Sequence, residues 1–288
     1  MTKLLPDQLK DLWQMVEHHE LSREQFQERQ ETLLAEHRKL WQDALILPGL
    51  KDLSASIIAE LCRYTGTNDS EVVRRRCTEA LKDLKGEWGT GVTGQDPQAI
   101  ERFYDQSQAM MYELMWWHTL SDDNSPLSYV LAMELAKAQG CKDFLDFGSG
   151  VGSGAILFAH NGFNVTLADI SSTMLQLCRW RLEQRGLTGC YLDLKETALP
   201  DGAFDIVCAM DVFEHLADPV GTVDLLWRAM KPGGLLYGRF HAEQDEDRPH
   251  HIVQDFQPTL KRLSELGFRE FWRDEWLWGH QVFQKAEG

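Results

Sequence analysis

The sequence lacks the features that mark secreted, membrane-spanning and repeat proteins. Its six cysteines are scattered over 288 residues, with no C-x-x-C pair and no compact framework for disulfides, so reduced thiols are expected. No apolar run approaches the roughly 18 residues that a membrane-spanning helix needs. The N-terminal stretch is polar from Asp7 onward, unlike a signal peptide. A cytoplasmic protein without membrane association is therefore expected.

Positive charge is also scarce. The chain has 29 lysines and arginines against 45 acidic residues, which gives a formal net charge of −16. Phosphate backbones repel such a chain unless a basic face overcomes the repulsion. The run Arg74-Arg75-Arg76 is too short for this, because on a helix its members point in different directions. Nucleic acids are thus not expected as partners.

What the sequence does contain is a glycine-rich run after a buried strand. Residues 141–147 have the length of a strand, glycines occupy every second position from 148 to 154, and residues 155–160 are typical of a helix. Free N–H groups at such a helix start suit an anionic group. The spacing differs from the G-x-G-x-x-G of dinucleotide sites, and Asp146 would repel a pyrophosphate but attract an ammonium group. A ligand with both amino and carboxylate groups is predicted.

This run resembles the first motif of the class I methyltransferases that use S-adenosylmethionine (SAM), an acidic residue followed by G-x-G-x-G. A second expected strand over 163–169 ends in Asp169, and further strands over 190–194, 203–211 and 235–238 follow in the family's order. Lys231-Pro232-Gly233-Gly234 fits the end of a helix and a turn before the last of these. The resemblance implies an α/β fold, a Rossmann-like seven-stranded core.

The resemblance also implies a SAM site along the ends of these strands. Asp169 would hold the ribose hydroxyls, at a distance from the first motif close to the roughly 20 residues expected of a ribose-binding acid. Asp193 and Leu194 would contact the adenine. The alternatives are a helix cap for Asp169 and a solvated loop acid for Asp193. The full set of expected SAM-binding residues is Asp146, Gly148, Ser149, Gly150, Asp169, Ile170, Met174, Asp193, Leu194 and Asp211.

The first 125 residues are a different kind of sequence, with apolar residues at helical spacing. A capping box, Ser22 to Gln25, predicts the start of a second helix, and Asp96-Pro97 predicts the start of a later one. We expect an α-helical cap over 1–125 and a SAM-binding domain over 126–288. Within the cap we expect a helix over 72–84, a linker over 86–94 and one helix from 97 to 117.

Three residues are the main candidates for catalysis. Tyr104 lies in a segment similar to the one ahead of the first motif in small-molecule methyltransferases, where aromatic side chains help to close the active site. A ring face would stabilise the sulfonium of SAM by about 0.5–2 kcal/mol. His215 and His241 are candidate general bases, and His251 is a further one.

A metal site is a separate hypothesis. Asp211-Val212-Phe213-Glu214-His215 is similar to the E-x-x-E-H element with which quinone O-methyltransferases and some RNA 2′-O-methyltransferases bind a divalent metal. Two carboxylates and an imidazole would hold Mg²⁺, Mn²⁺ or Zn²⁺. Because Glu-His after the fourth strand also occurs in methyltransferases without metal, we favour helix capping and packing here, and no metal ligand is assigned.

The function that these features favour is transfer of methyl from SAM to an oxygen, nitrogen or carbon of a small-molecule metabolite. Two alternatives stay open. The first is a SAM-consuming cyclase that forms azetidine-2-carboxylate and methylthioadenosine from SAM alone. The second is a non-catalytic SAM-binding scaffold. The small molecule is the expected partner, and a homodimer is left open.

Overall fold

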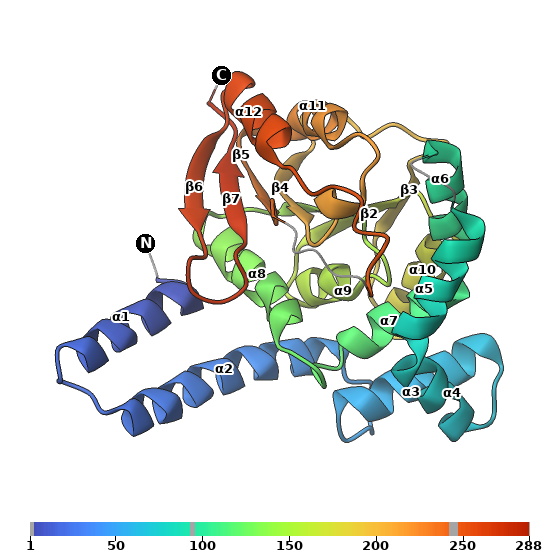
Figure 1. Cartoon of the computed structure of the whole chain (residues 1–288), viewed down its shortest axis with the longest axis horizontal. Coiled ribbons are helices and arrows are strands. Elements are labelled where there is room, and N and C mark those ends of the chain that lie inside the picture. The colour runs from blue at the N-terminus through green and yellow to red at the C-terminus, as the bar shows by residue number, and fades with distance from the viewer. Residues whose placement is uncertain (1–2, 93–95, 242–246, 288) are drawn as a thin grey trace.

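A computed structural model describes residues 3–92, 96–241 and 247–287 (Figure 1). Its centre is a seven-stranded sheet with the order β3-β2-β1-β4-β5-β7-β6. The first five strands are parallel and β7 is antiparallel to both of its neighbours. This confirms the predicted α/β core. The strands are β1 (Asp143–Phe147), β2 (Asn164–Asp169), β3 (Cys190–Asp193), β4 (Phe204–Ala209), β5 (Met230–Gly238), β6 (Arg269–Arg273) and β7 (Gln281–Gln284).

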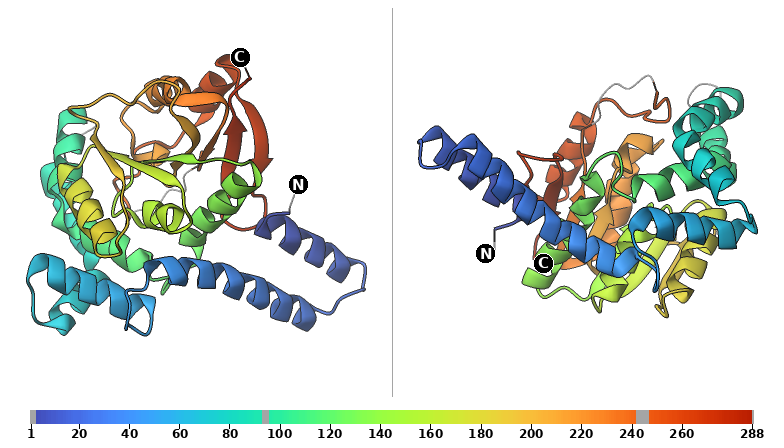
Figure 2. Two further views of the ribbon diagram at one scale, coloured as in Figure 1. Left: turned by 180° about the vertical axis from the view of Figure 1, so that it is seen from behind. Right: turned by 90° about the horizontal axis from the view of Figure 1, so that it is seen from below.

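Helices cover both faces of the sheet (Figures 1 and 2). Right-handed crossovers place the helices that follow β1 and β2 on one face and the helix that follows β4 on the other, because the strand order reverses between β1 and β4. Ligands of such sheets bind at this reversal, beyond the carboxyl ends of the strands. One face carries α8 (Ser128–Ala138), α9 (Ser153–His160) and α10 (Ser172–Glu183), and the other carries α11 (Pro219–Ala229) and α12 (Gln257–Glu265).

The part of the chain before α8 is helical, as predicted. The capping box at Ser22 is confirmed, because its hydroxyl accepts from the Gln25 N–H at 3.1 Å and its own N–H donates to the Gln25 side chain at 2.9 Å. The first two helices form an antiparallel pair that extends from the body of the molecule (Figures 1 and 2). The helices are α1 (Leu5–Glu17), α2 (Arg23–Leu45), α3 (Leu53–Thr65), α4 (Ser70–Thr78), α5 (Ala80–Gly91), α6 (Pro97–Gln106) and α7 (Gln108–Trp117).

Several predicted boundaries are wrong. Helix α5 continues through the glycines of the expected linker to Gly91, because Trp88 is buried edge-on against Phe103, with ring centroids 4.9 Å apart. Residues 93 and 94 of that linker lie outside the described residues. The expected helix over 72–84 is divided between α4 and α5, and β5 already begins at Met230, ahead of the expected turn.

The single helix expected from 97 to 117 is interrupted at Ser107. The Ser107 hydroxyl accepts from the Met110 N–H at 3.0 Å and so caps α7, while it donates to the Glu87 carboxylate at 2.5 Å. The hydrogen bonds of the Ser107 hydroxyl with the Met110 N–H and the Glu87 carboxylate therefore favour the start of a new helix after Ser107.

The helical cap and the sheet domain share a buried ionic contact. Glu60 of α3 accepts from Arg181 of α10 at 2.8 Å and from Arg185 at 2.7 Å, and the side chains of Glu60 and Arg181 are fully buried. Arg181 also donates to the carbonyl of Val151 at 2.5 Å and to the Ser153 hydroxyl at 3.0 Å. The cap is thereby tied to the glycine-rich loop.

All six cysteines are free thiols. Within the described ranges, no helix combines the length and the apolar character needed to cross a lipid bilayer.

Candidate functional site

Gly148 begins the loop between β1 and α9. Its φ is +67°, and a Cβ at this position would lie 2.6 Å from Val212 Cγ2, so the turn requires glycine. Its N–H donates to the Ala168 carbonyl, near the end of β2, at 2.8 Å. Further along, a Cβ at Gly154 would lie 2.2 Å from the Tyr129 ring. The glycines thus let the loop lie directly against its neighbours.

Asp169, at the end of β2, holds the loop from the side. One carboxylate oxygen accepts from the Gly150 N–H at 2.9 Å and the other accepts from the Ser171 N–H at 2.9 Å. A carboxylate has about four acceptor positions, so Asp169 keeps acceptor capacity toward the pocket that it lines. Its predicted contact with ribose hydroxyls stays a prediction.

Asp146 lies beneath the loop and is fully buried. Its carboxylate accepts from the Ala155 N–H at 3.0 Å and from the Tyr129 hydroxyl at 3.3 Å. It is not among the residues that line the pocket. In this structure, therefore, Asp146 supports the first turn of α9, and its predicted contact with an ammonium group stays a prediction.

Burial makes the carboxyl groups of Asp146 and Asp169 weaker acids than usual. It raises the pKa of Asp146 to about 7, against the opposing effect of its hydrogen bonds. It also raises the pKa of Asp169 to about 6. Since burial penalises the charged form of each acid, a cationic ligand near the loop would favour ionisation of both.

One cavity of about 610 Å³ extends from the loop past α6 and α7 to the short helix η2 (Phe213–His215) and the segment 248–251. Of the thirteen predicted site residues, three do not line it: Asp146, Asp193 and His241. Ten do: Tyr104, Gly148, Ser149, Gly150, Asp169, Ile170, Met174, Leu194, Asp211 and His215. These placements bring most of the predicted set into one space, while the individual roles remain predictions.

Two of the remaining residues have other neighbours. The Asp193 carboxylate accepts from the Ser172 hydroxyl at 2.5 Å and from the Lys195 N–H at 3.0 Å. The His241 ring accepts from Arg239 Nε at 3.2 Å and packs so closely on Gly279 that a Cβ there would lie 2.3 Å from it. Neither arrangement directs the side chain into the cavity.

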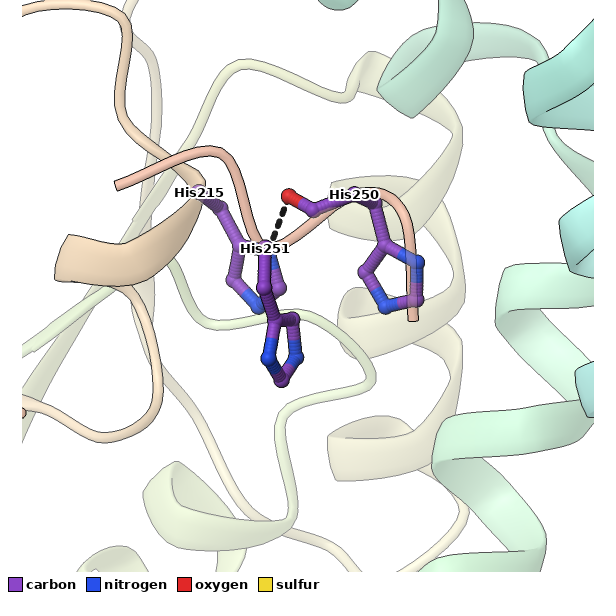
Figure 3. A group of neighbouring side chains, drawn as sticks. All are labelled: His215, His250 and His251. Carbon is purple, nitrogen blue, oxygen red and sulfur yellow. Dashed lines mark hydrogen bonds between the residues drawn. The ribbon is translucent and has the colours of Figure 1, made fainter. Parts of the chain in front are cut away.

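The far end of the cavity is a histidine cluster, formed by His215, His250 and His251 (Figure 3). The Nδ1 atom of His215 lies 3.0 Å from the His250 carbonyl. The His215 and His250 rings are stacked, with centroids 5.2 Å apart, and His251 lies edge-on to both. One potential ligand atom from each ring lies within 4.8 Å of the others. Burial lowers the pKa of His250 to about 2 and that of His251 to about 3.

Three buried polar atoms near this cluster make no hydrogen bond in the structure: the Tyr104 hydroxyl, His250 Nδ1 and Glu214 Oε2. The Tyr104 ring centroid lies 5.9 Å from that of His215. Burial raises the pKa of Glu214 to about 8, with Asp211 as the next contributor. Unpartnered buried groups are rare in folded proteins and point to a ligand or another function.

The residues of the metal motif after β4, which the sequence offered only as a hypothesis that was not favoured, do not come together as one group of ligands. Asp211 accepts from Arg239 at 3.2 Å, and among the described residues the group of converging metal-binding atoms contains His215 but neither Asp211 nor Glu214. Sequence reasoning gave no role to His250, which is 35 residues from His215. The pair His250-His251 is the signal in the sequence that could have marked this end of the site.

The strand-rich part of the chain is similar to known proteins. Residues 145–238, from β1 to β5, match the family model described as "Methyltransferase domain". The match covers about a third of the chain and, together with the sheet topology, supports the class I SAM-dependent methyltransferase core that the glycine run predicted. SAM is the co-substrate that this class implies.

The relatives are enzymes of quinone metabolism by name. A demethylmenaquinone methyltransferase from Thermus thermophilus is 36% identical over 146 residues, which are 49% of this chain and 60% of the relative. A ubiquinone biosynthesis O-methyltransferase from Histophilus somni is 27% identical over 154 residues, 49% of this chain and 62% of the relative. A 2-methyl-6-phytyl-1,4-hydroquinone methyltransferase from Synechocystis is 27% identical over 85% of this chain and 71% of its own length. The chain thus spans about three fifths of the length of the first two.

Proposed function

We propose that this chain transfers the methyl group of SAM to a hydroxyl oxygen of a small aromatic molecule. One observation carries the proposal: a single cavity has the glycine-rich loop and Asp169 at one end and Tyr104 with the histidine cluster at the other. Donor and acceptor would therefore share one space, which lowers the entropic barrier to their reaction. The quinone-related names of the relatives support an aromatic acceptor, and the name ubiquinone biosynthesis O-methyltransferase supports methylation at oxygen.

The loop end suits the donor. Asp169 would accept hydrogen bonds from the ribose hydroxyls, and the loop backbone from Gly148 to Val151, which lines the cavity, would lie against the methionine moiety. The rings of Tyr104 and Trp117 line the cavity, and a ring face stabilises a sulfonium by about 0.5–2 kcal/mol.

The reaction is a direct displacement. The acceptor oxygen forms a bond to the methyl carbon, the carbon–sulfur bond breaks, and its electron pair neutralises the sulfonium, while the hydroxyl proton leaves. The positive charge on sulfur thus disappears as the reaction proceeds. The chain's contribution is to align the two reactants and to exclude water.

The test is to incubate the purified protein with SAM, with and without a panel of phenols and hydroquinones, and to identify products by mass spectrometry. We expect S-adenosylhomocysteine and a methylated phenol, both only when the acceptor is present. Methylthioadenosine formed from SAM alone would overturn the proposal in favour of the cyclase. SAM binding with neither product would favour the scaffold.

A variant links the result to the site. Asp169→Asn should weaken SAM binding about 10- to 100-fold, since hydrogen bonds to a charged group contribute about 1.5–3 kcal/mol. Asp224→Asn, which removes a carboxylate that pairs with Arg262 away from the cavity, is the control and should bind SAM as the parent chain does. Titration calorimetry measures both.

A further inference from the structure

We propose that His215, His250 and His251 bind a divalent transition-metal ion, with one coordination position left facing the cavity for the acceptor oxygen. The contact with the acceptor rests on the methyl transfer proposed above, whereas the metal site itself does not. It differs from the carboxylate-containing motif considered from the sequence, because two of its three ligands come from the segment before α12.

The geometry of the three rings is close to that of a metal site. Their potential ligand atoms lie within 4.8 Å of one another. Zinc–nitrogen bonds of about 2.0–2.1 Å in a tetrahedral site place the nitrogens about 3.3 Å apart. The rings therefore need to approach one another by no more than about 1.5 Å, which side-chain rotation can supply. Figure 3 shows the three rings gathered from two separate segments of the chain.

The hydrogen bond of His215 leaves its Nε2 atom free to bind a metal. A carbonyl oxygen can only accept, so the 3.0 Å contact with the His250 carbonyl places a hydrogen on His215 Nδ1. Its Nε2 atom then carries a lone pair. Metal-binding histidines are commonly oriented in this way, with the second ring nitrogen donating to a carbonyl or carboxylate.

The orientation of the His250 ring decides which of its nitrogens is available to an ion. His250 is buried and its Nδ1 atom makes no hydrogen bond in the structure, although the ring sits against the stacked ring of His215. Leaving a buried polar atom unsatisfied costs about 1–3 kcal/mol. Figure 3 shows this Nδ1 atom turned away from the other two rings and Nε2 turned toward them, so Nε2 is the atom that would bind the ion.

The ligand chemistry defines the class of ion. Imidazole nitrogens suit Zn²⁺, Fe²⁺, Co²⁺, Ni²⁺ and Cu²⁺, whereas Mg²⁺ and Ca²⁺ take oxygen ligands. Three protein ligands with an open fourth position are typical of catalytic zinc sites. All three histidines line the cavity, so the open position would face the space assigned to the acceptor.

The neighbouring arginines leave room for a cation. Arg248 lies 3.8 Å from the Glu113 carboxylate, and Arg239 lies 3.2 Å from the Asp211 carboxylate. Each positive charge near the cluster is therefore balanced by a negative one.

The ion would take over the task that the sequence assigned to a histidine base. A cation beside the acceptor oxygen lowers the pKa of its hydroxyl. The proton then leaves to water, and the oxygen lone pair forms the bond to the methyl carbon. His215 would act as a ligand and would not carry the proton.

The test uses the whole chain, stripped of metal with a chelator and titrated with Co²⁺ as a visible probe. We expect one equivalent to bind with the strong visible absorption of four-coordinate Co²⁺, and Zn²⁺ to displace it where Mg²⁺ does not. X-ray absorption of the zinc-loaded protein should show three imidazole ligands. No binding, or fewer than three imidazoles, would overturn the proposal without any need for a variant.

Variants distinguish the two ligand sets. His250→Ala and His251→Ala should each weaken Co²⁺ binding by more than the 10- to 100-fold that loss of an outer partner costs. Glu214→Gln and Asp211→Asn should retain the metal. His160→Ala, which removes an exposed histidine at the end of α9, controls for surface binding. Loss of binding in the carboxylate variants with retention in the histidine variants would reverse the assignment.

Failure of the metal site can be told apart from failure of the proposed reaction. Methylated product formed at an unchanged rate by the metal-free protein overturns the role of the metal alone. A tight Co²⁺ complex in a protein that never consumes SAM supports the site and overturns the methyl transfer. SAM binding to each variant, measured by calorimetry, verifies that the loop end is intact.

Discussion

The two ends of the cavity are held together by different kinds of contact. At the loop end, backbone N–H groups of Gly148, Gly150 and Ala155 all donate to fixed acceptors. At the histidine end, ring packing and one hydrogen bond to a carbonyl hold His215 and His250, and three buried polar atoms have no partner. The comparison teaches that backbone hydrogen bonds fix the loop end before a ligand arrives, with Asp169 and the unpartnered Ser149 hydroxyl left to face it, whereas the histidine end depends on ring packing.

The largest expected effect tests the support behind the loop end. Glu60→Ala leaves Arg181 buried without its carboxylate, which should lower the free energy of unfolding by about 3–5 kcal/mol. Lys39→Ala breaks the exposed pair with Asp43 and should cost no more than about 0.5 kcal/mol. Urea unfolding of both variants measures the difference. Equal losses would show that the loop does not depend on this buried contact.

A smaller effect is expected from pH. The pKa of Asp146 rises from 3.8 to about 7 on burial, so its contribution to stability is present below pH 4 and is lost as pH rises toward 7. Asp146→Asn should therefore gain about 2 kcal/mol relative to the parent chain between pH 5 and pH 8. Thermal unfolding across this range measures the gain.

Asp143 supplies the control with the opposite sign. The hydrogen bond from Lys231 lowers its pKa, so its contribution is present above pH 4 and is lost as the solution becomes more acidic. Asp143→Asn should alter the acid side of the profile and leave the range from pH 5 to pH 8 as in the parent chain. The same slope in both variants would contradict the assignment to Asp146.

The smallest effect compares one tyrosine from each end. The Tyr129 hydroxyl donates to Asp146, whereas the Tyr104 hydroxyl makes no hydrogen bond in the structure. Tyr129→Phe should cost about 1–2 kcal/mol, and Tyr104→Phe should cost nothing or gain about 1 kcal/mol. Chemical unfolding of both proteins without ligand checks this. A larger loss at Tyr104 than at Tyr129 would remove the contrast between the two ends.

The loop end could be predicted from the sequence because its determinants are local. Strand β1, the glycines and Asp169 belong to two consecutive strand-to-helix connections. Backbone geometry or a backbone hydrogen bond fixes the position of each. The histidine end could not be predicted in the same way. His250 meets His215 only because the chain returns to the same sheet edge after β5, and this depends on the fold.

The helical cap shows the same contrast between features that local sequence determines and features that tertiary packing determines. The capping box at Ser22 and the cap at Asp96 were readable from a few neighbouring residues. The second half of helix α5 was missed because its glycines have low helix propensity, while burial of Trp88 against Phe103 decides its conformation. Tertiary packing, which no local pattern contains, overrides the local preference there.

The buried contact between the cap and α10 has a consequence for biosynthesis. Glu60 precedes Arg181 by 121 residues, so at 5–20 residues per second its partner is synthesised about 6–24 s later. During that interval α3 has no arginine with which to bury its carboxylate. Helix α3 therefore completes its packing only after the glycine-rich loop and α10 have been synthesised.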